Sequence, residues 1–151
     1  PTQLDDFVAP TVNTYSLETT IAEKIDAILR LMEFSSRMKD YYDIYYLANK
    51  FHFDGSVLTE ALRKTFENRG HTFNVEQFEQ VMAFDEDEVM QKKWKAFCRK
   101  IDTKTDDYST VLRTIKDFLT KPIVAAINVT CFNEQWNAAT NTWGQGDKYD
   151  G

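Results

Sequence analysis

The sequence predicts a mainly α-helical domain, a bundle of about six helices in a single chain of 151 residues. Apolar residues recur every three or four positions along most of the chain, which is the period of an amphipathic helix. Serine, asparagine and aspartate stand just before several of these stripes, where helices find their N-caps. The hydrophobic content of 42% with 28% charged residues is typical of one globular core.

Each predicted helix has its own start or stop signal. Ser16 caps the first, with Glu18 in its first turn, and Gly70 ends the third. Asp54 or Ser56 caps the third helix, and Asn74 caps the fourth. The predicted ranges are 17–33, 38–50, 57–69, 75–84, a fifth from the acidic run 85–88 through 101, and 108–119.

The two ends of the chain carry weaker patterns. Residues 1–15 contain short apolar pieces at strand-like spacing, too few to form a sheet alone. Pro122 is expected to end or kink the sixth helix, and residues 123–129 favour a helical restart over a strand. Residues 129–151 are expected to be a partly irregular tail whose Trp136 and Trp143 pack back on the body.

Composition excludes several classes of protein. The net charge of −6 argues against a generally basic surface that coats nucleic acid, although a local basic site remains compatible with it. No apolar run approaches the length of a membrane span, and no signal peptide pattern is present, so we expect a cytoplasmic protein. Cys98 and Cys131 are far apart without ligand-spaced neighbours, which favours buried free thiols over a disulfide or a zinc site.

Two charged residues fall on faces that should pack inward. Lys24 projects between Leu17, Ile28 and Leu31, beside the main stripe of the first helix, whereas Asp26 and Arg30 are expected on its solvated side. Asp40 heads an apolar stripe of the second helix. Each has an ordinary explanation, because lysine stems lie along apolar faces and aspartate is common in a first turn. Together they form either a structural ion pair or part of a site.

The start of the second helix is dense in charge. Arg37, Lys39, Asp40 and Asp43 place two cations and two carboxylates within two turns. Such a cluster is either a solvated helix entrance or a site in which the cations bind phosphate and a carboxylate handles a proton. The run 85–88 is interpreted as a solvated acidic turn rather than a metal site, and His52 and His71 as loop or core-edge residues.

These residues resemble a known family. Ile21-Ala22-Glu23-Lys24, Ser36-Arg37-Met38-Lys39-Asp40-x-Tyr42-Asp43-Ile44, Thr65-Phe66-Glu67-x-Arg69 and Trp94-x-x-Phe97 are similar to the AbiEii/AbiGii-type nucleotidyltransferase toxin family, at its spacings over most of residues 1–125. The resemblance places Lys24 in the third motif of the family. It places Arg37, Lys39, Asp40 and Asp43 in the fourth motif.

The resemblance implies a fold, an activity and partners. Residues 1–15 would end an upstream α/β domain of the polymerase-β-like nucleotidyltransferase fold, and residues 16–128 would form a helical C-terminal domain. The first two motifs, which hold divalent metal, are absent, so this chain alone is expected to bind no cofactor and to be inactive. For the complete protein the resemblance implies Mg²⁺, an NTP, an acceptor such as RNA, and a cognate antitoxin.

Within this family the site residues have expected roles. Lys24 and Asp40 are expected to be catalytic, and Arg37, Lys39 and Asp43 to bind substrate, with no metal ligand among them. Lys24 would supply a cation to the triphosphate, and Asp40 would orient or deprotonate the acceptor hydroxyl. The alternative is a non-catalytic helical interaction module in which Lys24 and Asp40 form a structural ion pair.

Overall fold

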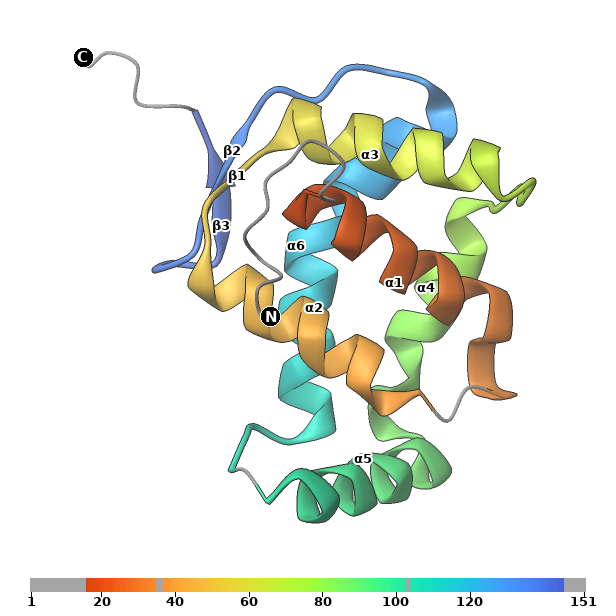
Figure 1. Cartoon of the computed structure of the whole chain (residues 1–151), viewed down its shortest axis with the longest axis vertical. Helices are drawn as coiled ribbons and strands as arrows, with labels where there is room; N and C mark the ends of the chain where they lie inside the picture. Colours follow the sequence, from red (N-terminus) through yellow and green to blue (C-terminus); the bar gives the residue numbers. More distant parts are fainter. Residues whose placement is uncertain (1–15, 35–36, 103, 146–151) are drawn as a thin grey trace, which may run out of the picture.

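The computed structural model describes residues 16–34, 37–102 and 104–145, and it confirms a mainly α-helical protein (Figure 1). The predicted segment 1–15 lies outside the described residues. The α-helices are α1 (Leu17–Leu31), α2 (Met38–Lys50), α3 (Gly55–Asn68), α4 (Val75–Met82), α5 (Glu88–Ile101) and α6 (Tyr108–Asn128). Two 3₁₀ turns, η1 (Met32–Phe34) and η2 (Ala83–Glu86), follow α1 and α4.

The capping signals that predicted these helices act as expected. The Ser16 hydroxyl accepts the Thr19 backbone N–H at 3.0 Å and so begins α1. Asn74 forms a capping box with Gln77 at the start of α4. Gly70, just beyond α3, has a φ of 69°, a left-handed conformation that glycine adopts without strain.

Helix α6 is the centre of the bundle. It runs through the middle of the molecule in Figure 1 and contacts α2, α3, α4 and α5. Ile115, Phe118 and Leu119 on it are fully buried. Helices α1 and α2 lie side by side, with Ile21, Ile25 and Ile28 of α1 and Ile44 of α2 also fully buried. The two helices that carry the predicted site are therefore anchored in the core.

The sixth helix does not end at Pro122, which was one of the two predicted outcomes there, because α6 continues to Asn128. The preference for a helix after Pro122 is confirmed over residues 123–128. A proline inside a helix leaves the carbonyl four residues earlier without its N–H donor, here the carbonyl of Phe118. The indole Nε1 of Trp143 donates to that oxygen at 2.9 Å, and the Trp143 ring stacks on Phe118 at 6.0 Å. The C-terminal segment thus supplies the hydrogen bond that the proline cannot make.

A small antiparallel sheet was not predicted. It joins β1 (Phe53–Asp54), β2 (Gln135–Asn137) and β3 (Thr142–Gly144) in the order β1-β2-β3, with Trp136 opposite both Phe53 and Trp143. Trp136 is buried and donates from Nε1 to the Ala48 carbonyl at 2.7 Å. The expectation that both tryptophans pack on the body is confirmed.

The structure also bears on the predicted state of the cysteines and on the presence of membrane-spanning helices. Both cysteines are free, as predicted, but Cys131 is exposed and Cys98 is half-buried, so the predicted burial is wrong. Among the described residues, no helix has the length and apolar character that crossing a membrane requires.

Candidate functional site

The predicted charge cluster forms a connected network between α1 and α2. Lys24 Nζ lies 2.9 Å from Asp43 Oδ2 and 3.5 Å from Asp40 Oδ1. Arg37 Nε lies 3.0 Å from Asp40 Oδ2, as an ion pair whose angles do not make a hydrogen bond, and Lys39 Nζ lies 2.7 Å from Asp43 Oδ2. The structure thus brings all five predicted residues together.

Local structure explains why these side chains meet. Lys24 lies one turn from Ile21 and Ile28 on α1, so its stem is held at the edge of the core while 23% of the side chain stays exposed. Asp40 is in the first turn of α2, where its backbone N–H donates to the Arg37 carbonyl at 3.0 Å. Its side chain is only 4% exposed. A buried carboxylate needs cations beside it, and Lys24 and Arg37 supply them.

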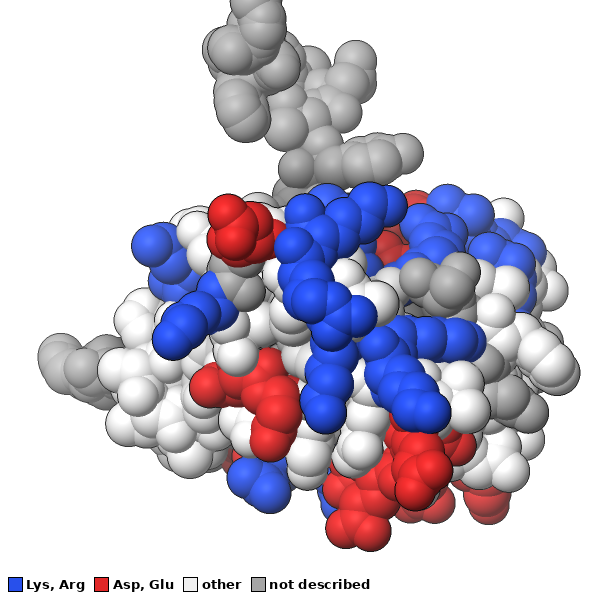
Figure 2. Space-filling model, turned by 90° about the horizontal axis from the view of Figure 1, so that it is seen from below, with Lys and Arg blue, Asp and Glu red and all other residues white. Residues whose placement is uncertain are grey.

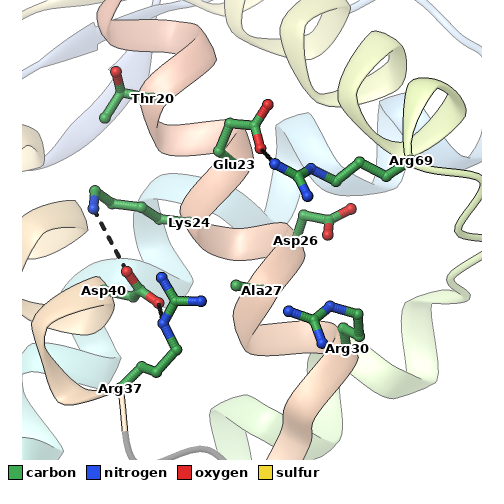
Figure 3. Close-up of a pocket in the computed structure, with 9 residues that line it drawn as sticks. All are labelled: Thr20, Glu23, Lys24, Asp26, Ala27, Arg30, Arg37, Asp40 and Arg69. Atoms are coloured by element: carbon green, nitrogen blue, oxygen red, sulfur yellow. Dashed lines mark hydrogen bonds and ion pairs between the residues drawn. The ribbon is translucent and has the colours of Figure 1, made fainter.

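The network is one wall of a pocket of about 300 Å³ (Figure 3). Its lining includes Lys24, Arg37 and Asp40 from the predicted set, and Arg30 and Arg69, which were not predicted as site residues. Arg30 has no ion-pair partner among the described residues. In this lining four cations face three carboxylates, an excess of positive charge that suits a phosphate ligand.

The opposite wall holds charges that sequence reasoning missed. Arg69 of the α3 C-cap pairs with Glu23 of α1, as Figure 3 shows. Asp26 is buried, contrary to the expected solvated position, and both of its oxygens lie 3.0 Å from His71 Nδ1. A signal was present, because Ala22 and Leu29 flank Asp26 on the helix at i−4 and i+3 and are themselves buried.

The carboxylates of the network face cations rather than further metal-ligating side chains. Asp40 lies beside Lys24 and Arg37, and Asp43 Oδ2 lies beside Lys24 and Lys39. Within the ranges that the structure describes, no group of three or more His, Cys, Asp or Glu side chains gathers at ligand distance. The acidic residues around 85–88 likewise form no such group, and Asp87 serves as the N-cap of α5, accepting the Met90 N–H at 3.0 Å.

Comparison with known proteins identifies the class. A family model described as "Nucleotidyl transferase AbiEii toxin, Type IV TA system" matches residues 1–121. The match covers most of the chain and includes every residue of the network. The chain therefore belongs to the AbiEii nucleotidyltransferase toxin family of type IV toxin–antitoxin systems. Searches of curated proteins and of solved structures found no significant match.

Proposed function

We propose that this protein is the toxin of a bacterial toxin–antitoxin or phage-defence pair and transfers a nucleotide from an NTP to an acceptor such as RNA. Lys24 and Asp40 are its catalytic residues. The observation that carries the proposal is their position together: Lys24 Nζ is 3.5 Å from the buried Asp40 carboxylate, beside a pocket with excess positive charge. The family name supports the reaction class and implies a cognate antitoxin.

Lys24 binds the triphosphate in this proposal. Its ammonium lies beside the carboxylates of Asp40 and Asp43, and its side chain is only 23% exposed. In such a partly desolvated position a charge–charge interaction is stronger than in bulk solvent. Three cations of the network, Lys24, Arg37 and Lys39, face only two carboxylates, so it can take up additional negative charge. Arg37 and Lys39 have the more exposed side chains and contact phosphate from the solvent side.

Asp40 acts on the acceptor. It accepts or orients the proton of the attacking hydroxyl once phosphate binding draws Lys24 and Arg37 away from its oxygens. The hydroxyl oxygen then bonds to the α-phosphorus of the NTP, and pyrophosphate leaves. Asp43 holds Lys24 and Lys39 in position, because its Oδ2 lies within 2.9 Å of both ammonium groups. The helical bundle fixes both carboxylates on one helix, α2, three residues apart.

Mg²⁺ belongs to the proposed reaction, since metal ions neutralise a triphosphate during nucleotidyl transfer. The carboxylates described here do not fit that ion, because cations already engage them. We therefore assign it no ligand among these residues. Its ligands lie in parts of the protein other than the network.

The test is transfer of label from α-³²P-NTPs to cellular RNA by the full-length protein. Lys24→Met and Asp40→Asn keep side-chain size and each should lower the transfer rate at least 100-fold, as expected for loss of a key electrostatic or proton-transfer group. The control, Arg63→Met, breaks an ion pair of Arg63 with Glu60 on α3 and should retain activity. Full transfer by both site variants would refute the assignment.

A second candidate is a helical interaction module without catalysis, in which the network is only structural. The observation that favours it is that both Asp40 oxygens already have cationic neighbours. Under this alternative the wild-type protein transfers no nucleotide, and the site variants lose stability and antitoxin binding. Thermal melts of the same variants separate the two candidates.

A further inference from the structure

Helix α5 concentrates positive charge in a chain whose net charge is −6. It has one acidic residue, Glu88, and its cations are Lys92, Lys93, Lys95, Arg99 and Lys100. The helix lies at the bottom of the molecule in Figure 1, and the view from below shows lysines and arginines gathered across that face (Figure 2). The same view shows acidic residues beside these cations, so the excess of positive charge is local to α5 rather than a property of the whole face.

Four cations on α5 differ from those of the network in forming no ion pair with a described residue. Lys92, Lys95, Arg99 and Lys100 are exposed, and none forms an ion pair with a described residue. Lys92, Lys95 and Arg99 follow each other at i, i+3 and i+7, which places them along one stripe opposite the buried side. A merely solvated helix usually intersperses acids among its cations, and this stripe has none between Lys92 and Arg99.

An exposed aromatic residue of α2 connects, through a second ring, to Phe97 on the side of α5 that faces the core. Tyr46 of α2 is 46% exposed and stacks on Tyr42 at 6.3 Å, and Tyr42 in turn lies 5.8 Å from Phe97 of α5. Lys50 Nζ lies 5.8 Å from the Tyr46 ring. Aromatic rings beside cations form a platform on which nucleobases stack while the cations contact phosphate.

The platform is continuous with the candidate site. Lys39, Tyr42 and Tyr46 stand at i, i+3 and i+7 on α2 and so share one face of that helix. At 1.5 Å per residue, Tyr46 lies about 10 Å along the helix from Lys39. A strand that passes from the outer face of α5 to Tyr46 can therefore bring its end to the network.

We propose that the outer face of α5, together with Tyr46, binds the phosphate backbone of a single-stranded segment of the RNA acceptor. The identification of that strand as the acceptor rests on the proposed nucleotidyl transfer. A nucleic acid fits this surface better than an acidic protein does. Val89 is the one large apolar side chain exposed on α5, too little for the apolar centre of a protein interface.

The test measures binding of a fluorescein-labelled single-stranded RNA to the full-length protein by anisotropy across salt concentrations. If four α5 cations contact phosphate, the slope of log K against log salt should include about −3 from them. In the variant Lys92→Gln/Lys95→Gln/Arg99→Gln, the slope should be less negative by about 2. The RNA affinity at 0.1 M salt should be about 100-fold lower. Tyr46→Leu should weaken binding about tenfold through lost stacking.

A matched control removes the same charge elsewhere. Arg63→Gln/Lys64→Gln/Lys121→Gln changes cations of α3 and of α6 beyond its midpoint, away from α5 (Figure 1), and should leave affinity within twofold. Equal RNA affinity of the two triple variants would overturn the proposal. So would tighter binding of polyglutamate than of RNA by the wild-type protein.

Transfer kinetics separate this inference from the proposed function. With the α5 variant, the KM for RNA should rise while the KM for the NTP and the melting temperature stay unchanged. If the α5 variant transfers nucleotide with an unaltered KM for RNA, the proposed RNA surface on α5 is contradicted, whereas the proposed nucleotidyl transfer is not. A wild-type protein that binds RNA through α5 but transfers no nucleotide would support the surface and contradict the proposed function.

Discussion

Replacing Lys24 by methionine should cost little stability, because the network is redundant. Without Lys24, Asp40 keeps Arg37 at 3.0 Å and Asp43 keeps Lys39 at 2.7 Å. Breaking a buried ion pair costs roughly 3–5 kcal/mol when it strands a charge. Since no charge is stranded here, we expect about 1 kcal/mol, the scale of a partly exposed pair. That is a fall in melting temperature of about 2–4 °C for a chain of this size.

Asp40→Asn should behave similarly, since Lys24 keeps Asp43 at 2.9 Å and the half-exposed Arg37 remains hydrated. Thermal and urea melts of both single variants and of Lys24→Met/Asp40→Leu provide the measurement. Small losses together with abolished transfer would assign the defect to chemistry rather than folding. A loss above about 3 kcal/mol in either single variant, restored in the apolar double variant, would refute this reasoning and favour the interaction module.

Three further predictions concern the framework. Gly55→Ala should destabilise by about 1–3 kcal/mol in urea melts, because its Cβ would lie 2.6 Å from a backbone oxygen, whereas Gly144→Ala, with no atom within 4 Å, should be near neutral. Burial raises the pKa of Tyr41 to about 12, so its neutral form stabilises the fold below pH 10. Tyr41 should then contribute a fall in stability of about 1.4 kcal/mol per pH unit from pH 10 towards 12, on top of the contributions of Tyr45 and Tyr108, and the slope for Tyr41→Phe should be smaller by that amount. Trp143→Phe should cost about 1 kcal/mol. It should cost less in a Pro122→Ala background, where a backbone N–H can replace the indole, and equal costs in both backgrounds would contradict that role.

Local signals were sufficient for the helices but not for the sheet. Capping residues such as Ser16 and Asn74 act within three or four positions, so the sequence displays them directly. The pairing of Phe53 with Trp136 joins segments more than 80 residues apart, and strands of two and three residues have no alternation to read. The continuation of α6 through Pro122 depends on Trp143 for the same reason.

In the candidate site, too, residues recognisable from local signals differ from those that depend on long-range packing. Lys24 and Asp40 were recognisable because each lies on the packing side of its own helix, Lys24 beside an apolar stripe and Asp40 at the head of one. The contact between them shows that both face one interface. Arg69 and His71 enter the pocket region from the end of α3, and their partners, Glu23 and Asp26, are on α1. Those pairings depend on how α3 packs against α1, which helical periodicity does not specify.

Helix α2 explains how one short element serves both the network and the proposed RNA surface. Its inner side is fixed in the core by Tyr41 and Ile44, its flank presents Asp40 to α1, and its outer side presents Tyr46. Successive residues are about 100° apart on a helix, so packing of the inner side sets the direction of the other two. The angle between the proposed catalytic carboxylate and the proposed stacking ring is therefore set by the packing of the bundle.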